Sequence, residues 1–83
     1  MQAQITLKTR DLETGEVVGE QSTTCATEDG QTFVIAPGYL PGLADAPAED
    51  VHVEILPPVQ QVTFTAKSVT IDEAGNTVLS LTN

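Results

Sequence analysis

The sequence contains very few of the residues that build disulfide scaffolds, histidine-based metal sites or nucleic-acid interfaces. Its 83 residues include one cysteine, one histidine and no tryptophan. One cysteine cannot form an internal disulfide, so a disulfide-stabilised scaffold is excluded. One histidine excludes a histidine-rich metal site. Only three residues are Lys or Arg, which is too few for the phosphate contacts that direct binding of nucleic acid needs.

Long apolar runs are also absent. No stretch approaches about 18 consecutive apolar residues, the length that predicts a transmembrane helix, so we expect no membrane partner. The first residues, Met1-Gln2-Ala3-Gln4-Ile5, have neither the basic nor the apolar segment of a signal peptide. We therefore expect assembly in the cytoplasm, and the initiator-like Met1 predicts a complete gene product.

The charge is strongly of one sign. Twelve Asp and Glu against three Lys and Arg give a formal net charge of -9. The acidic residues are spread from Asp11 to Glu73 and form no acidic tail. Such a charge favours solubility and suppresses self-association in free solution. It would equally suit docking onto a basic partner surface, and the sequence does not choose between the two.

The residues that are abundant favour strands. Val, Ile and Thr together make 25 of the 83 residues, and these residues are enriched in β-structure. Ile5 and Leu7 alternate with polar residues, as do Val51, Val53 and Ile55, which is the pattern of half-buried strands. No helical periodicity of useful length occurs. The sequence predicts one all-β domain over 1–83, a small antiparallel sandwich or barrel of six to seven strands with no substantial helix.

Turn and bulge signals divide the chain further. We expect turns with Gly15 and with Asp29-Gly30, and a bulge near Gly19. The apolar run Phe33-Val34-Ile35 predicts a strand covered on both faces. Pro57-Pro58 should end the strand before it. From Val59 to Asp72 the apolar parity changes without a turn residue, which predicts a bend near Lys67-Ser68 where the chain crosses between sheets.

The core predicted for such a domain is thin. Two Phe, one Tyr and no Trp leave it without most of the large aromatics that dominate burial. Neither a disulfide nor a metal site compensates, although small scaffolds commonly need one. We therefore expect oligomerisation to supply the missing stability.

The Pro/Gly-rich segment 37–50 is the best candidate for recognition. Its prolines and glycines forbid a strand and disfavour a helix, and apolar residues on a loop of a rigid scaffold are common recognition elements. The same residues could instead form a lid over the core, and both interpretations stay open. With the N-terminal arm or strand start at 1–5, the candidate interface comprises Met1, Gln2, Ala3, Gln4, Tyr39, Leu40 and Leu43.

Neither cysteine-histidine catalysis nor calcium binding is expected. Cys25 and His52 could form a nucleophile and base despite their distance in sequence, but both lie in predicted strands without an accompanying motif. The acidic turns at 11–16 and 72–76 lack the ligand spacing of a calcium loop. We expect solvated hairpin turns there, no cofactor, no metal and no enzymatic activity.

Roughly the first 40 residues carry a combination of strand and turn signals. These are Ile5-x-Leu7, Asp11-x-x-Thr14-Gly15-Glu16, Gly30-x-x-Phe33 and Pro37-Gly38-Tyr39. This pattern, built from common turn chemistry, resembles that of bacterial mucin-binding repeats.

These features favour a structural protein that packs onto a larger complex. The form we expect is a small phage virion protein such as a capsid decoration (cement) protein. Its partners would be copies of itself, for instance in a trimer, and a larger capsid or tail protein. The alternative is a free acidic binder or inhibitor of a host protein, in which the charge of -9 mimics DNA. Such mimics gather their acidic residues on one face.

Overall fold

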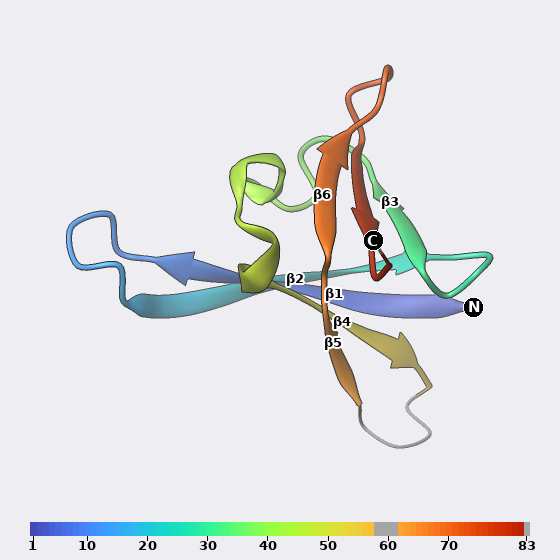
Figure 1. Cartoon of the computed structure of the whole chain (residues 1–83), viewed down its shortest axis with the longest axis horizontal. Helices are drawn as coiled ribbons and strands as arrows, with labels where there is room; N and C mark the ends of the chain where they lie inside the picture. Colours follow the sequence, from blue (N-terminus) through green and yellow to red (C-terminus); the bar gives the residue numbers. More distant parts are fainter. Residues whose placement is uncertain (58–61, 83) are drawn as a thin grey trace.

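Antiparallel strands in two sheets make up the computed structural model of this chain, which describes residues 1–57 and 62–82 (Figure 1). Sheet A has four strands in the order β2-β1-β4-β5, and sheet B has three in the order β3-β7-β6. The predicted all-β antiparallel fold of six to seven strands is confirmed. The strands are β1 Gln2–Arg10, β2 Val17–Ala26, β3 Thr32–Ile35, β4 Val51–Leu56, β5 Thr63–Thr65, β6 Ser68–Ile71 and β7 Thr77–Ser80.

The core lies between the two sheets and is built by alternation along the strands. On β1, every second residue from Ala3 to Leu7 is buried, while the residues between them face the other side of sheet A. Sheet B alternates in the same way, because Phe33 and Ile35 are buried and Val34 is about half exposed. The prediction that this run is covered on both faces is therefore wrong. The buried hydrophobic residues are Ala3, Ile5, Leu7, Phe33, Ile35, Leu40, Leu43, Val51, Val53, Ala66 and Leu79.

The N-terminal segment 1–5 is the start of a central strand. β1 pairs with β2 on one side and with β4 on the other, so that Ala3 lies opposite both Cys25 and Ile55. Ala3 is fully buried in the chain's own core. Its predicted contact with a neighbouring chain is therefore wrong, because a residue paired on both sides and closed over by sheet B has no surface to offer.

The chain crosses between the sheets at three places. A turn after Ala26 leads from β2 to β3, the segment 37–50 leads from β3 back to β4, and the pair Ala66-Lys67 leads from β5 to β6. The crossing from β5 to β6 confirms the bend predicted near Lys67-Ser68. The register shift at Thr9/Arg10, opposite Val17 and Gly19, confirms the predicted bulge. The proposed start of the long element at Val59, and Pro58 before it, lie outside the described residues.

Segment 37–50 folds back over the core. Leu40 and Leu43 are buried in it, which favours the lid interpretation for these two side chains. Two short 3-10 turns, η1 Leu43–Asp45 and η2 Ala48–Asp50, then lead into β4. These turns are the only helical elements among the described residues, and none of the described helices is long and apolar enough to cross a membrane.

Candidate interaction surface

The structure separates the seven residues predicted to lie at an interface into two groups. Met1, Gln2 and Tyr39 are exposed, and Gln4 is half-buried. Ala3, Leu40 and Leu43 are buried in this chain's core. For Leu40 and Leu43, as for Ala3, a direct contact with another protein is therefore wrong, because their side chains already pack inside the fold.

Met1 and Tyr39, which are distant in sequence, lie along one groove. A hollow of about 710 Å³ is lined by Met1, Ala26, Val34 and residues of the turn between them. A second hollow of about 210 Å³ is lined by Thr23, Cys25, Val34 and Tyr39. Val34 lines both hollows, so they adjoin at this side chain. We call the two adjoining hollows together the β2–β3 groove, defined by Met1, Thr23, Cys25, Val34 and Tyr39.

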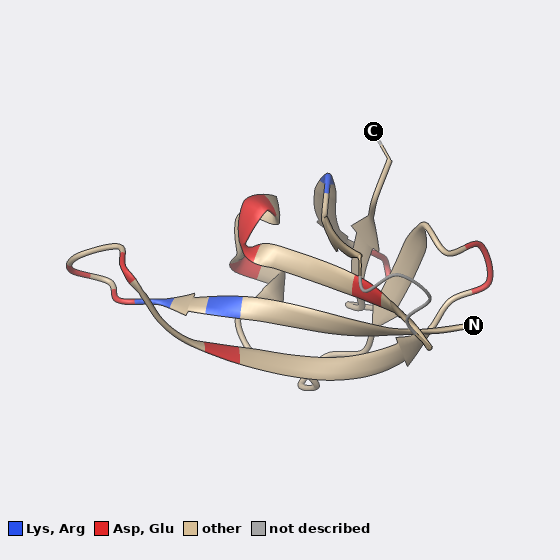
Figure 2. Ribbon diagram, turned by 90° about the horizontal axis from the view of Figure 1, so that it is seen from below, with Lys and Arg blue, Asp and Glu red and all other residues tan. Residues whose placement is uncertain are grey.

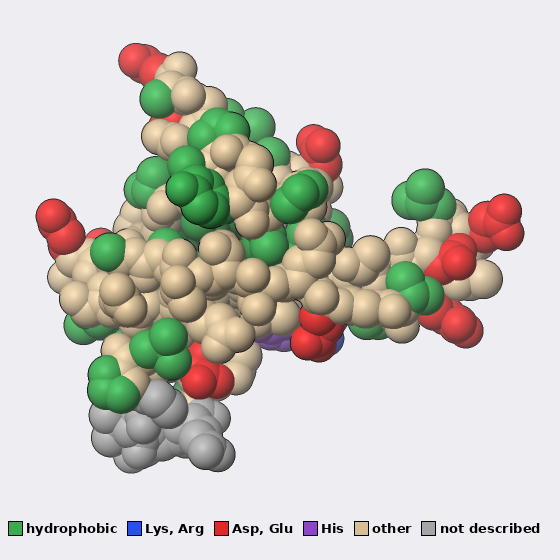
Figure 3. All heavy atoms as spheres, turned by 180° about the vertical axis from the view of Figure 1, so that it is seen from behind, with side chains coloured by type: hydrophobic (Ala, Val, Ile, Leu, Met, Phe, Trp, Pro, Cys, Tyr) green, Lys and Arg blue, Asp and Glu red, His purple; other side chains and the backbone are tan. Residues whose placement is uncertain are grey.

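The side chains that rim this groove are apolar and open to solvent. Tyr39 is 69% exposed, Met1 66% and Val34 49%. Figure 3 shows hydrophobic side chains gathered where sheet B and segment 37–50 lie, with acidic side chains mainly at the protruding ends of the molecule. Solvent-exposed apolar side chains that meet along a depression are suited to a protein partner.

The turn between β2 and β3 holds the two edges of the groove in place. The N–H groups of Gln31 and Thr32 each donate to Asp29 Oδ1 at 2.8 Å. The Thr27 hydroxyl donates to Thr32 O, also at 2.8 Å. The two backbone hydrogen bonds stabilise the charged carboxylate and lower the pKa of Asp29. The turn therefore fixes the position of β3 relative to β2.

Glycine is required in this turn for two reasons. Gly30 has a φ of 71°, which residues with a Cβ rarely adopt. A Cβ at Gly30 would also lie 3.2 Å from Met1 Sδ. The absence of a side chain at Gly30 lets Met1 lie close to the turn and form the end of the groove.

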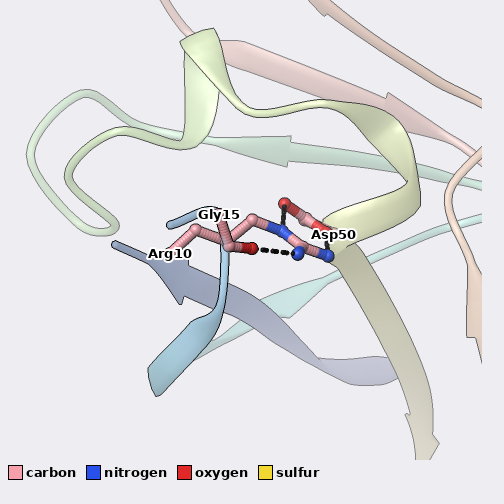
Figure 4. Close-up of polar contacts among 3 residues, drawn as sticks. All are labelled: Arg10, Gly15 and Asp50. Atoms are coloured by element: carbon pink, nitrogen blue, oxygen red, sulfur yellow. Dashed lines mark hydrogen bonds and ion pairs between the residues drawn. The ribbon is translucent and has the colours of Figure 1, made fainter. Parts of the chain in front are cut away.

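A partly buried ion pair, with Asp50 buried and Arg10 43% exposed, joins β1 to segment 37–50 (Figure 4). Arg10 Nε donates to Asp50 Oδ2 and Arg10 Nη2 donates to Asp50 Oδ1, both at 2.7 Å. The third nitrogen, Nη1, donates to Gly15 O at 2.7 Å. The Asp50 side chain is 4% exposed, and the hydrogen bonds from Arg10 hold the pKa of Asp50 below its usual value. This fork-to-fork geometry makes the pair a structural clamp.

We expect Arg10→Gln to destabilise the fold most near neutral pH and much less in acid. The folded pKa of Asp50 is lowered, so its charge stabilises the fold above the unfolded pKa of about 3.9, and that contribution is lost as pH falls through the folded pKa. The difference in melting temperature between the wild type and Arg10→Gln should therefore shrink below about pH 4. Lys67→Gln, an equal charge change at an exposed site, is the control. A difference that stays constant with pH would contradict this role.

Cys25 and His52 do not form a catalytic pair. Cys25 lies opposite Ala3 on the core face of sheet A, whereas His52 lies opposite Thr6 on the outer face. β1 separates their two strands. Partial burial also raises the pKa of the Cys25 thiol, which lowers its reactivity. The arrangement therefore lacks both the contact and the activated thiol of such a dyad.

The acidic turns use their carboxylates internally. Asp11 Oδ1 accepts hydrogen bonds from the N–H groups of Glu13 at 2.7 Å and Thr14 at 3.1 Å. Asp72 Oδ1 accepts from the N–H groups of Ala74 at 3.0 Å and Asn76 at 2.9 Å. Within the described part of the chain, no group of three or more potential metal ligands lies together.

Comparison with known proteins gives no significant match to a family model, a curated protein or a solved structure. The surface is therefore described by its own geometry. Sequence reasoning identified Met1 and Tyr39 but missed Val34, because the run 33–35 gave no sign of which residue would face outward. It also missed the Arg10–Asp50 pair, which joins residues 40 positions apart.

Proposed function

We propose that this chain is a non-enzymatic structural protein that packs into a larger assembly through exposed apolar side chains. The observation that carries the proposal is the number of large hydrophobic side chains that stay exposed, compared with the number of hydrophobic residues that are buried. Among the described residues, nine large hydrophobic side chains are exposed, against eleven buried hydrophobic residues, two of which are alanines. A small domain buries a limited share of its surface, and contact with neighbours would cover the remainder.

The specific form we propose is a small phage virion protein such as a capsid decoration protein. Its partners would be copies of itself and a larger capsid or tail protein. A short all-β chain with an apolar groove suits this task, because it needs neither a substrate pocket nor a cofactor. The β2–β3 groove is the surface that we assign to contact with other chains.

The placement of the acidic side chains weighs against the DNA-mimic alternative. Figure 2 shows acidic residues at the β1–β2 turn, on β2, at the β2–β3 turn, around the 3-10 turns and on β4. They are thus distributed over separate ends and faces of the molecule. A mimic of DNA needs them in rows on one face, and binding by such a mimic would weaken steeply as salt screens the charges.

Tyr39→Ser should weaken binding to the assembly while leaving the fold intact. Truncating an aromatic anchor at the centre of an interface typically costs about 2 kcal/mol or more, which is roughly a 30-fold loss of affinity. The measurement is co-sedimentation of the purified chain with capsid particles of candidate phages. Ile71→Ser is the control, because Ile71 is 59% exposed but lies on β6, outside the groove.

Equal binding by Tyr39→Ser and Ile71→Ser would remove the groove from the proposed interface. Failure of the wild-type chain to sediment with any of the capsids would count against the virion form of the proposal. Binding to a nucleic-acid enzyme that disappears at high salt would favour the DNA mimic instead.

A further inference from the structure

The hydrogen-bonding direction of β2 follows from two backbone contacts. In an antiparallel ladder, the N–H and C=O groups of successive residues point alternately to the two sides. Thr27 N–H donates to Met1 O at 2.9 Å, so in the register of β1 with β2 the odd-numbered residues of β2 face β1. A second contact gives the same result. Ala66 N–H donates to Val51 O at 2.9 Å, so the odd-numbered residues of β4 face β5 and its even-numbered residues face β1. The even-numbered residues of β1 therefore face β4, which leaves its odd-numbered residues to pair with the odd-numbered residues of β2.

The even-numbered residues of β2 therefore direct their backbone groups away from the sheet. These residues are Glu20, Ser22, Thr24 and Ala26, and we call their outward N–H and C=O groups the β2 edge. β2 is the last strand of its sheet, and Figure 2 shows it as the outermost strand. No hydrogen bond joins the β2 edge to any other described residue.

This edge lacks the features that normally prevent strands from pairing between molecules. Exposed edges are usually protected by lysine, proline, a bulge, short length or a covering segment. β2 is ten residues long and contains neither Lys nor Pro, and its bulge lies at its first residues, Val17 to Gly19, before the β2 edge begins. The edge strands of sheet B are different, because β3 and β6 have only four residues each. The N–H of Thr32, which points outward from β3, is also taken by Asp29.

The β2 edge is also nearly neutral on a strongly acidic molecule. Glu20 is the only charged residue in β2. It lies directly opposite Lys8 on β1, and opposite charges on facing residues of neighbouring strands attract. A second copy approaching along this edge therefore meets little of the repulsion expected from a net charge of -9.

We propose that two copies of this chain associate by antiparallel pairing of their β2 edges about a two-fold axis, which joins their A sheets into one continuous sheet. The axis passes beside Thr23. In this register Ser22 of each copy lies opposite Thr24 of the other, and Glu20 lies opposite Ala26, so no like charges face each other. The two copies of Thr23 lie opposite each other, a favourable cross-strand pair.

The β2–β3 groove lies beside this axis. Thr23, Val34 and Tyr39 line the same hollow, so Val34 and Tyr39 lie where the added strand would cover them. The inference rests on the proposed function for its premise that the chain works within an assembly. It names the partner, a second copy, and the surface that joins them.

Sedimentation of the purified chain alone tests this interface. From about 10 μM to about 1 mM, mass action should convert the wild type from monomer to dimer. Ser22→Pro removes an outward N–H without breaking the ladder to β1, so it should stay monomeric over the same range. Thr65→Pro is the control, because the N–H of Thr65 points away from β4 at the opposite edge of sheet A. It should dimerise like the wild type.

Amide hydrogen exchange on the wild type gives a reading that needs no variant. The N–H groups of Gln21 and Thr23 are protected by β1 in monomer and dimer alike. Those of Ser22 and Thr24 should exchange roughly tenfold or more slowly once most of the chain is dimeric, since exchange then occurs from the residual monomer. Added salt should strengthen the dimer only slightly, because the β2 edge itself is nearly neutral and salt screens only the repulsion between the more distant acidic residues of the two chains.

Disulfide trapping defines the register. In a Cys25→Ser background, Thr23→Cys should cross-link two copies on oxidation, because facing residues of a non-hydrogen-bonded pair have Cα atoms about 4.5 Å apart. Thr70→Cys on β6 should not. A monomer at every concentration, a trimer, or a dimer in which Ser22 and Thr24 exchange freely would overturn the proposal. Co-sedimentation with capsids is a separate measurement, so the failure of one idea is distinguishable from the failure of the other.

Discussion

Phe33→Ala is expected to lower the free energy of unfolding by about 3–5 kcal/mol, the usual cost of removing a fully buried aromatic ring. Phe33 is completely buried and is the largest of the fully buried side chains. It belongs to the core cluster between the two sheets. A chain of 83 residues has a total stability of about 4–12 kcal/mol. The variant should therefore be largely unfolded in moderate urea, as measured by circular dichroism.

Phe64→Ala is the matched control, since these are the only two phenylalanines in the chain. Phe64 lies on β5 opposite Val53 but remains 44% exposed. The transfer free energy of a partly exposed ring is correspondingly small, about 1 kcal/mol or less. Equal losses from the two substitutions would contradict the position of the core between β1, β4 and sheet B.

The contrast between the two phenylalanines shows where sequence patterns predict structure well. Alternation in β1 and β4 predicted the strands and their buried faces, because a period of two leaves a single choice of inward face. The parity change before Ser68 predicted the crossing from β5 to β6 for the same reason. The run Phe33-Val34-Ile35 has no period, so the outward position of Val34 depends on the pairing of β3 with β7.

The candidate site could be predicted only in part. Tyr39 stands in a Pro/Gly-rich segment that cannot form a strand, which marked it as a recognition residue. Its position beside Thr23 and Val34 follows from the β2–β3 turn and the fold of segment 37–50. Neither segment's sequence indicates that it lies next to the other. The Arg10–Asp50 clamp has the same character, because it joins two segments that only the assembled sheet brings together.

Ala3→Glu is expected to abolish folding, because it places an unpaired charge between the sheets. Ala3 is fully buried and pairs with both Cys25 and Ile55, so a longer acidic side chain there would meet neither water nor a cation. An uncompensated buried charge costs several kcal/mol, and the added volume costs about 1–3 kcal/mol more. The sum is comparable to the whole stability of the domain. Loss of the β-sheet circular dichroism signal is the measurement.

Gln2→Glu carries the same charge change one residue earlier and should alter stability by no more than about 0.5 kcal/mol, as surface substitutions usually do. Gln2 begins β1 and is exposed. If residues 1–5 were an arm reaching toward neighbouring chains, both substitutions would leave the isolated fold intact and would weaken assembly instead. A folded Ala3→Glu protein would therefore support the interpretation of residues 1–5 as an arm. An unfolded Ala3→Glu protein beside a stable Gln2→Glu protein is the result expected when β1 lies between β2 and β4 in sheet A.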